Sequence, residues 1–193
     1  MTARPAVARV EGIANGSLDA ATVRLPQQEI AELARRPLYT EDLYEDPLVL
    51  VAVPGVANFD EFQAVTEKTV QHKTLTRLPL ILPEPDARLR RDFDRRCRDA
   101  GIQDRLRVVV EVGPWSTAMS YVRDGAGIGV VPRSATAGQS GLVVKALPPK
   151  LVPTNTVRVI CRKRSGGDDL DLTEAGTDFL EALREAARKM PVE

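Results

Sequence analysis

The chain has 193 residues, which is enough for one domain or two small lobes with a real hydrophobic core. Apolar residues make up 43% and charged residues 28%, a balance that excludes a disordered chain. The 27 basic and 27 acidic residues give a net charge of zero, which disfavours nonspecific binding to nucleic acid. No apolar run approaches the roughly 20 residues that span a bilayer, and the first residues lack a signal-peptide core. We therefore expect a cytoplasmic protein with no membrane partner.

Few side chains in the sequence suit catalysis or metal binding. Cys97 and Cys161 are the two cysteines, no C-x-x-C pair exists, and His72 is the only histidine. A zinc site would need further ligands from carboxylates, and a Ser-His-Asp or Cys-His arrangement would have to use His72. We interpret His72 as a partly exposed surface histidine. The composition therefore predicts a non-enzymatic protein without metal or other cofactor.

The first part of the chain is predicted to alternate helices and strands. Residues 5–14 carry apolar side chains at helical spacing, and residues 18–25 form a strand that Pro26 ends. The almost continuous apolar run from Leu48 to Val53 is typical of a central strand buried on both faces.

An arginine-rich helix is predicted between residues 87 and 100. Leu89, Phe93 and Cys97 recur at steps of four and form its buried stripe, so the Cys97 thiol is expected to act as a small apolar group. The opposite face interleaves both signs of charge, which indicates a solvated, ion-paired surface rather than a nucleic-acid site. That face holds Arg88, Arg90, Arg91, Arg95, Arg96 and Arg98 with Asp92, Asp94 and Asp99.

The remaining elements continue the alternation. Strands are predicted at residues 79–85, 105–113, 128–132, 142–149 and 157–164, and helices at 114–127 and 174–189. Cys161 shares the apolar face of its strand with two valines. The last helix should begin at Thr173 or Asp171 and bury an apolar stripe of Phe179, Leu180, Leu183, Ala187 and Met190. The pattern predicts an α/β fold with mainly parallel sheets.

The glycine-rich segment Gly125 to Gly129 does not predict a dinucleotide site. A phosphate-binding glycine turn must follow a strand and open a helix, whereas these glycines follow a predicted helix and precede a strand. They are expected to end the helix and to make a tight connection.

Two places where a strand leads into a helix are better candidates for ligand binding. Pro83 and Glu84 follow the strand in PLILPEP, and Trp115, Ser116 and Thr117 follow the strand in VVVEVG. Ligands of open α/β sheets bind at the carboxyl ends of strands, where a helix N-terminus offers unpaired N–H groups. The hydroxyls of Ser116 and Thr117 can donate to an anion, although Ser116 can equally cap its helix.

Six segments of the chain, taken in order, resemble the effector-binding domain of LysR-type transcriptional regulators. They are NGSLDAATVRLP, RPLYTEDLYEDPLVLVAVP, PLILPEP, VVVEVGPWSTAMSYVRDGAGIGVVP, LVVKALPP and LTEAGTDFLEALREAA. The motifs G-x-L-D before a strand, E-x-L-x-x-x-P-L-V-L-V, and a helix before G-x-G-I-G-V-V-P are typical of that domain. The match covers nearly all of residues 5–190.

The resemblance implies a two-lobed fold of the periplasmic-binding-protein type 2 kind, with lobe one incomplete at its N-terminus. We expect lobe one to comprise residues 1–78 plus 161–193, and lobe two residues 79–160. Neither the helix-turn-helix nor the linker helix of the family is found in the sequence, so we expect no specific DNA binding by this chain alone. The resemblance also implies dimers, and the missing strands would expose a sheet edge that favours self-association.

The resemblance places a small effector between the lobes, and the residues favour an anion. Arg24 follows the G-x-L-D strand and can pair with a carboxylate through two hydrogen bonds. The expected effector-binding residues are Arg24, Pro83, Glu84, Trp115, Ser116 and Thr117. A solute-binding protein of the same fold, an enzyme on that fold and a non-functional remnant are the alternatives.

Overall fold

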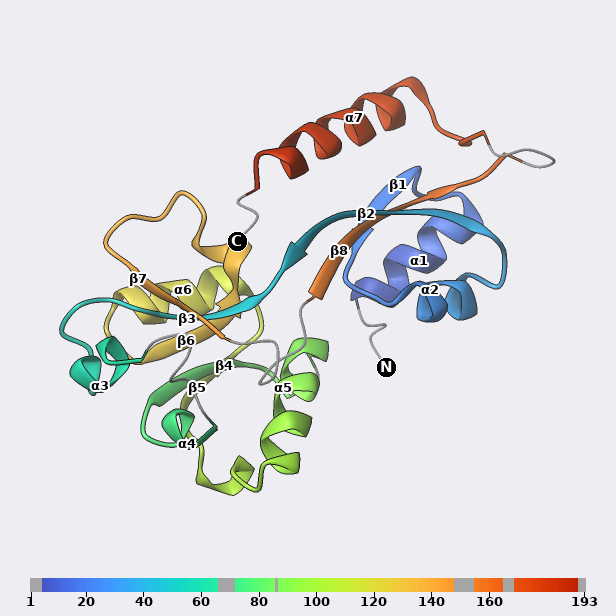
Figure 1. Cartoon of the computed structure of the whole chain (residues 1–193). Coiled ribbons are helices and arrows are strands. Elements are labelled where there is room, and N and C mark those ends of the chain that lie inside the picture. The colour runs from blue at the N-terminus through green and yellow to red at the C-terminus, as the bar shows by residue number, and fades with distance from the viewer. Residues whose placement is uncertain (1–4, 66–71, 86, 148–154, 165–168, 191–193) are drawn as a thin grey trace. The chain divides into compact units, whose positions relative to one another are not determined.

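The computed structural model describes residues 5–65, 72–85, 87–147, 155–164 and 169–190 (Figure 1). The chain divides into two compact units. Unit 1 comprises Met1–Glu45 and Asn155–Glu193, and unit 2 comprises Asp46–Thr154. No helix in these described ranges combines the length and the apolar character that crossing a membrane requires.

Unit 1 is a three-layered α/β unit. Its elements are α1 (Pro5–Asn15), β1 (Ala20–Val23), α2 (Gln27–Ala34), β2 (Leu38–Asp46), β8 (Asn155–Arg162) and α7 (Glu174–Arg188). The sheet has the order β1-β8-β2, and β1 runs antiparallel to β8. Ile160 of β8 packs among residues of α1 and α2, whereas its neighbours Val159 and Cys161 pack with Leu180 of α7. The two sides of one strand therefore serve two separate apolar clusters.

Unit 2 is built on a five-stranded sheet with the order β5-β4-β6-β3-β7. Its strands are β3 (Leu48–Ala52), β4 (Pro79–Pro83), β5 (Arg107–Val112), β6 (Ile128–Pro132) and β7 (Val143–Ala146). Its helices are α3 (Phe59–Gln63), α4 (His72–Leu75), α5 (Arg88–Asp99) and α6 (Trp115–Arg123), with 3-10 turns η1 (Gln103–Arg105) and η2 (Arg133–Thr136). Alternate residues of β3 pack toward α5 and α6, which cover opposite faces of the sheet. The predicted burial of residues 48–52 on both faces is confirmed.

The α/β fold class is confirmed, but the sheets are not mainly parallel: β1 and β8 are antiparallel, and the five-stranded sheet is mixed. Strand β4 runs parallel to β5 and β6, whereas β3 runs antiparallel to β6 and β7. Helix α2 and strand β2 were not expected. Buried and exposed residues do not alternate along β2, because apolar and charged side chains lie on the same face of the strand.

The division into units differs from the expected one. The apolar strand β3 was expected in lobe one, but it pairs with β6 and β7 and therefore belongs to unit 2. The chain leaves unit 1 after Glu45 instead of after residue 78, and it returns at Asn155 instead of residue 161. The sequence of a strand that is apolar throughout does not indicate which sheet the strand joins. Its position depends on pairing with strands that are distant in the sequence.

Burial of individual side chains confirms some expectations and corrects others. Both thiols are buried, and Thr173 begins α7 by accepting a hydrogen bond from the Gly176 amide at 3.1 Å. Phe179 is 47% exposed, so it does not belong to the buried stripe of α7. Arg90 is 8% exposed and does not belong to the solvated face of α5. The expectation for His72 concerns a side chain outside the described part of the structure.

The glycine segment connects α6 to β6 as predicted. Gly125 follows α6 with a φ of +71°, a left-handed conformation that favours glycine. A Cβ atom on Gly127 would lie 2.7 Å from the carbonyl oxygen of Pro79, so this residue lets the chain pass close to β4.

Candidate functional site

The carboxyl ends of β4 and β5 bring most of the predicted site residues together in unit 2. The two strands are parallel, and Pro83 is the register partner of Val112. The amide of Glu84 continues the pairing by donating to the carbonyl of Val112 at 3.0 Å. The segments that follow both strands, Glu84 on one and Gly113 on the other, therefore lie side by side at one sheet edge.

The Glu84 carboxylate lies over Gly113. Both of its oxygens would be 3.3 Å from a Cβ atom at that position, so a larger residue there would crowd them. Glu84 is exposed. The edge thus presents one carboxylate directly before the start of α6.

Helix α6 begins at Trp115 and presents two hydroxyls near its N-terminus. Pro114 precedes the helix, and its carbonyl accepts from the amides of Thr117 and Ala118, each at 3.1 Å. No side chain caps this helix, so the option that Ser116 is a cap is not observed. Ser116 and Thr117 are exposed, whereas Trp115 is partly buried and packs against the apolar clusters on both sides of the sheet. Trp115 thus anchors the helix start, and the two hydroxyls face solvent.

The start of β3 and the end of β6 meet at the same edge, and sequence reasoning did not include them. Leu48 is the register partner of Pro132, and the amide of Arg133 donates to the carbonyl of Pro47 at 2.9 Å. Strand β6 runs parallel to β4, so Arg133 follows a third carboxyl end. Its Nε atom is buried and has no hydrogen-bond partner among the described residues. The only signal in the sequence was the position of Arg133 directly after a buried strand.

Asp46 stabilises the junction between the start of β3 and the end of β6. Its carboxylate is 1% exposed and accepts from the Ser134 amide at 2.9 Å and from the Ser134 hydroxyl at 2.7 Å. A buried charge of this kind needs such partners, so the pair holds η2 against the start of β3.

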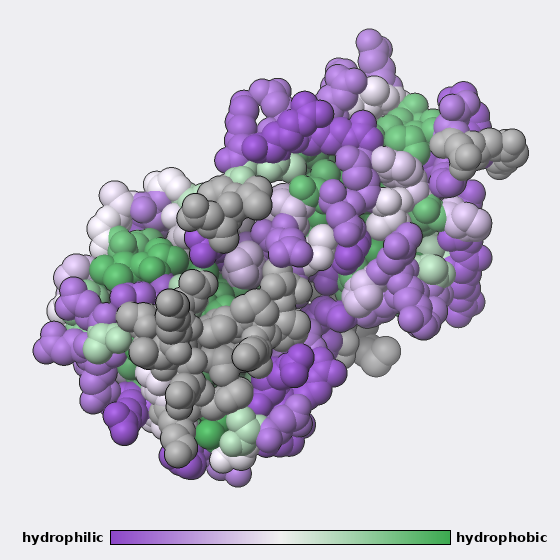
Figure 2. All heavy atoms as spheres, in the orientation of Figure 1, coloured by the Kyte–Doolittle hydropathy of each residue, from purple (hydrophilic) through white to green (hydrophobic). Residues whose placement is uncertain are grey.

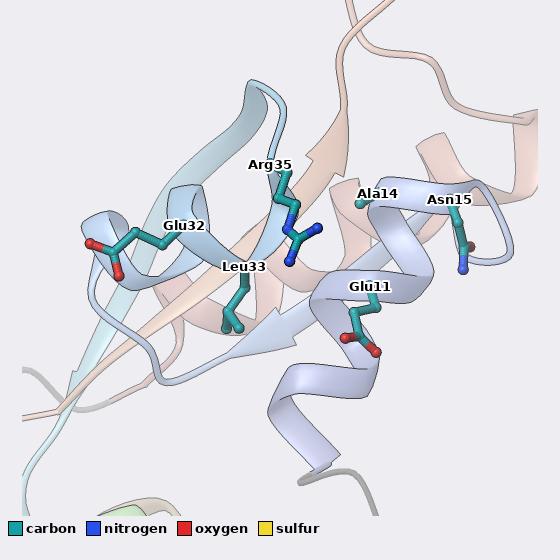
Figure 3. A pocket seen from close by; sticks show the side chains of 6 residues that line it. All are labelled: Glu11, Ala14, Asn15, Glu32, Leu33 and Arg35. Atoms are coloured by element: carbon teal, nitrogen blue, oxygen red, sulfur yellow. The ribbon is translucent and has the colours of Figure 1, made fainter.

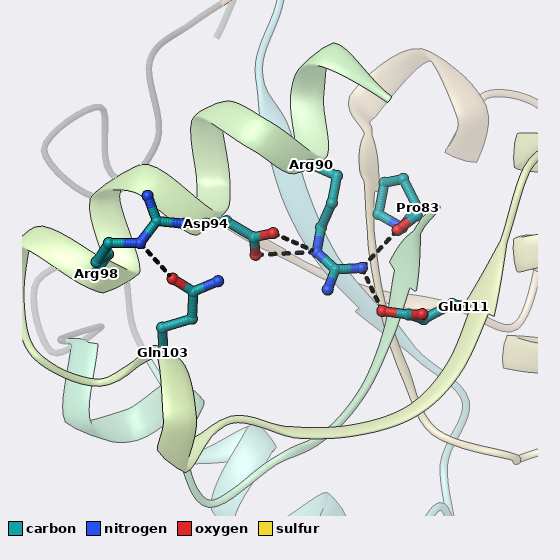
Figure 4. Close-up of polar contacts among 6 residues, drawn as sticks. All are labelled: Pro83, Arg90, Asp94, Arg98, Gln103 and Glu111. Carbon is teal, nitrogen blue, oxygen red and sulfur yellow. Dashed lines mark hydrogen bonds and ion pairs between the residues drawn. The ribbon is translucent and has the colours of Figure 1, made fainter. Parts of the chain in front are cut away.

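Arg90 braces the ends of β4 and β5 from α5 (Figure 4). Its Nη1 atom donates to the Pro83 carbonyl and to Glu111 Oε1, both at 2.7 Å. Its Nε atom lies 2.9 and 3.0 Å from the two carboxylate oxygens of Asp94. Burial alone would lower the pKa of Arg90, but the hydrogen bonds and charges of Glu111 and Asp94 outweigh it and raise that pKa. The guanidinium therefore stays charged and fixes the strand end that carries Glu84.

Arg24, the remaining predicted site residue, belongs to unit 1. It directly follows β1 and is partly buried. It is thus placed at the carboxyl end of β1, on a different sheet from the other five residues.

Unit 1 also contains a groove that none of the predicted site residues lines (Figure 3). It has a volume of 580 Å³ and is lined by Glu11, Ala14, Asn15, Glu32, Leu33 and Arg35. Arg35 ends α2 in a left-handed conformation with a φ of 54°, and its side chain reaches toward α1. Both signs of charge are exposed along this groove, so it shows no preference for an anion.

The described residues give little support for nucleophilic catalysis or for metal binding. Burial raises the pKa of the Cys97 thiol to about 12 and that of Cys161 to about 11, so neither thiol is ionised near neutral pH. Within the same residues, no three His, Cys, Asp or Glu side chains are grouped as metal ligands. The geometry at the edge of β4, β5 and β6 fits reversible binding by hydrogen bonds and charge.

Comparison with known proteins identifies the family. A model of the LysR substrate binding domain matches residues 3–188. No curated protein sequence matches the chain. Solved structures of LysR-family regulators have the same fold.

Three of these structures show the extent of the similarity. The regulatory domain of HypT from Salmonella typhimurium, bound to bromide, has a TM-score of 0.61 and 16% identity over 94% of this chain and 78% of that one. The regulatory domain of CcmR from Synechocystis PCC6803, in complex with 2-PG, has a TM-score of 0.61 and 18% identity over 94% and 79%. CbnR, a LysR family transcriptional regulator, has a TM-score of 0.63 and 19% identity over 96% of this chain and 58% of that one.

The chain belongs to the LysR substrate binding domain family. Its two units carry the type 2 periplasmic-binding-protein-like fold of the effector-sensing domains of LysR-type regulators. It spans a little over half of the CbnR chain.

Proposed function

We propose that the chain senses a small anionic effector at the edge formed by β4, β5 and β6 in unit 2. The observation that carries this proposal is the convergence of Glu84 and the N-terminus of α6, where exposed hydroxyls of Ser116 and Thr117 accompany the amides of a first helical turn. The first amides of a helix lack acceptors within the helix and carry partial positive charge, and at α6 the Pro114 carbonyl accepts from the Thr117 amide but from neither of the two amides before it. Pro83 and Trp115 hold the two segments in place, and Arg133 supplies a cation at the same edge.

Arg24 of unit 1 is the second proposed anion-binding group. A guanidinium can hold a carboxylate through two parallel hydrogen bonds. The relatives HypT and CcmR, whose structures hold bromide and 2-PG, support a small ligand for this family. Glu84 suits an effector that also carries a hydrogen-bond donor.

The proposal includes the wider role of the chain. It works in the cytoplasm as part of transcription regulation, forms homo-oligomers, catalyses no reaction and uses no cofactor. The 193 residues by themselves do not bind duplex DNA specifically, and their net charge of zero gives no general attraction to its phosphates.

Calorimetric titration of small carboxylates tests the site. Thr117→Val and Arg24→Ala should each weaken binding by about 1 kcal/mol, the usual net value of one hydrogen bond. Ser120→Ala is the matched control, since its hydroxyl already donates to the Ser116 carbonyl at 3.1 Å one turn further along α6. Binding that neither Thr117→Val nor Arg24→Ala weakens would show that the site lies elsewhere.

A further inference from the structure

The groove between α1 and α2 of unit 1 presents a carboxylate and a guanidinium that have no partner. Glu11 of α1 and Arg35 at the end of α2 both line the groove, and both are exposed. Neither side chain forms a hydrogen bond or an ion pair with another residue in the described part of the chain. The two opposite charges thus share one space without neutralising each other.

The walls of the groove are apolar and firmly packed. Ala14 of α1 and Leu33 of α2 line it, and both pack against the buried cluster that contains Ile30. Arg36 ties the ends of the two helices together by donating from Nη1 to the Ala14 carbonyl at 3.0 Å. Figure 2 shows small hydrophobic areas between hydrophilic side chains over α1 and α2. The volume of 580 Å³ lies within the usual range of small-molecule sites, about 300 to 1,000 Å³.

The backbone of Arg35 adopts a conformation that favours glycine. Its φ is 54°, and Asn58 is the one other non-glycine residue with a positive φ in the described ranges. Helices often end on a residue in this left-handed conformation, and that residue is most often glycine, because a Cβ atom is unfavourable there. Position 35 therefore carries a long charged side chain at a cost to the backbone, as residues at ligand sites often do.

Figure 3 shows how the charged groups lie. The side chain of Arg35 reaches from the end of α2 toward α1, from which Glu11 extends, and Leu33 lies beside them. The carboxylate of Glu32 points away from both groups, and it accepts a hydrogen bond from Gln28 at 3.1 Å. The groove therefore offers one anion-binding group, one cation-binding group and an apolar wall.

We propose that this groove binds a free α-amino acid with an aliphatic side chain. Arg35 holds the α-carboxylate, since its planar guanidinium can make two parallel hydrogen bonds, and Glu11 holds the α-ammonium. The aliphatic side chain packs against Ala14 and Leu33, where it leaves water. A zwitterion neutralises both charges at once, whereas a simple anion or cation leaves one of them unpaired. This site is separate from the effector site proposed in unit 2 and does not depend on it.

Titration of the isotope-labelled full chain with L-leucine, followed by its amide chemical shifts, tests the proposal. We expect saturable shifts at residues of α1 and α2 at about millimolar leucine. Isocaproate lacks the ammonium and isoamylamine lacks the carboxylate, so each should bind about fivefold more weakly than leucine. Shifts confined to unit 2, or no shifts at about 20 mM leucine, would overturn the proposal.

Two variants divide the contacts between the charged groups. Arg35→Gln should weaken leucine and isocaproate about fivefold and leave isoamylamine unchanged, whereas Glu11→Gln should weaken leucine and isoamylamine and leave isocaproate unchanged. Glu32→Gln is the matched control, because its carboxylate lines the same groove but is bonded to Gln28 and should change none of the three. Equal effects of all three variants would indicate a general charge effect and contradict the assigned contacts.

Arg35→Gly gives a second, independent measurement. Glycine suits a φ of 54°, so the melting temperature followed by circular dichroism should rise, whereas leucine binding should fall as far as in Arg35→Gln. A variant with a lower melting temperature would show that Arg35 serves the end of α2. A more stable variant that still binds leucine as the wild type does would also contradict the role assigned to Arg35.

Discussion

Arg184 on α7 and Glu41 on β2 form a two-pronged ion pair within unit 1. The Nε atom of Arg184 lies 3.1 Å from both carboxylate oxygens of Glu41, and its Nη2 atom lies 2.6 Å from Oε2. The Tyr39 hydroxyl completes the cluster by donating to Glu41 Oε2 at 2.6 Å and accepting from Arg184 Nη2 at 3.1 Å. The last helix is therefore attached to β2 by polar contacts as well as by its apolar side.

Removing the guanidinium should weaken this attachment. Arg184→Met is expected to lower the free energy of unfolding by about 1 kcal/mol at pH 7, the upper end for exposed pairs, because the side chains remain about a third exposed. Urea denaturation measures the loss. Lys189→Met is the control, since Lys189 pairs with Glu185 in full solvent and should contribute little.

The same cluster predicts a pH dependence. The hydrogen bond from Arg184 holds the pKa of Glu41 below its usual range. A carboxyl whose pKa is lower in the folded state stabilises the fold above its unfolded pKa, near about 4.3, and this contribution disappears as the pH falls through the folded pKa. The stability difference between wild type and Arg184→Met should therefore shrink in the acidic range. A difference that stays constant from pH 7 until the pH has fallen well below the folded pKa of Glu41 would contradict this.

Arg90 is expected to contribute more to stability than any other arginine of α5. Arg90→Met should cost about 3 kcal/mol, because it leaves the largely buried Asp94 without its cation and frees the Pro83 carbonyl. Arg90→Lys should recover only part of the loss, since an ammonium cannot copy the fork of contacts. Arg96→Met, at an exposed position of the same helix, should change the unfolding midpoint little. Equal losses for Arg90→Met and Arg96→Met would contradict the role assigned to Arg90.

The junction between Asp46 and Ser134 gives a separate test. Ser134→Ala removes one of the two hydrogen bonds that Ser134 makes to a buried carboxylate and should cost about 1 to 2 kcal/mol in thermal or urea unfolding. Ser140→Ala, at an exposed position of the loop that follows η2, serves as the control. A loss no larger than that of the control would show that the Ser134 hydroxyl contributes nothing measurable to holding Asp46.

Much of the fold could be predicted because local pattern determines it. The stripe of Leu89, Phe93 and Cys97 and the apolar run of β3 are complete within one short segment. The assignment of β3 to unit 2 could not be predicted, since it depends on pairing with β6 and β7 about 80 and 95 residues later in the chain.

The candidate site could likewise be predicted only where local sequence determines it. The carboxyl ends of β4 and β5 were predicted from the rule that strands lead into helices there, and the Pro83–Val112 register joins them. The sequence predicts a solvent-exposed Arg90, because charged residues surround almost the whole helix. Its burial is explained by contacts with Pro83 and Glu111, which lie outside the helix. Arg133 was missed because its place at the same edge follows from the pairing of β6 with β3 and β4.

The two cysteines should be unreactive in the folded protein. Cys97 and Cys161 are 1% and 0% exposed, and burial raises the pKa of these thiols to about 12 and about 11. Because the thiolate is the reactive form, a thiol with so high a pKa is almost wholly protonated at pH 8 and is also shielded from reagent. Ellman's reagent at pH 8 should therefore label neither cysteine in native buffer and both in concentrated urea. The labelling rate should rise with urea in parallel with unfolding measured by circular dichroism, and Cys97→Ala and Cys161→Ala variants assign each phase. Rapid labelling of either thiol in native buffer would mean that its surroundings open without global unfolding, contrary to the packing of Cys97 beside Phe93 and of Cys161 beside Leu180.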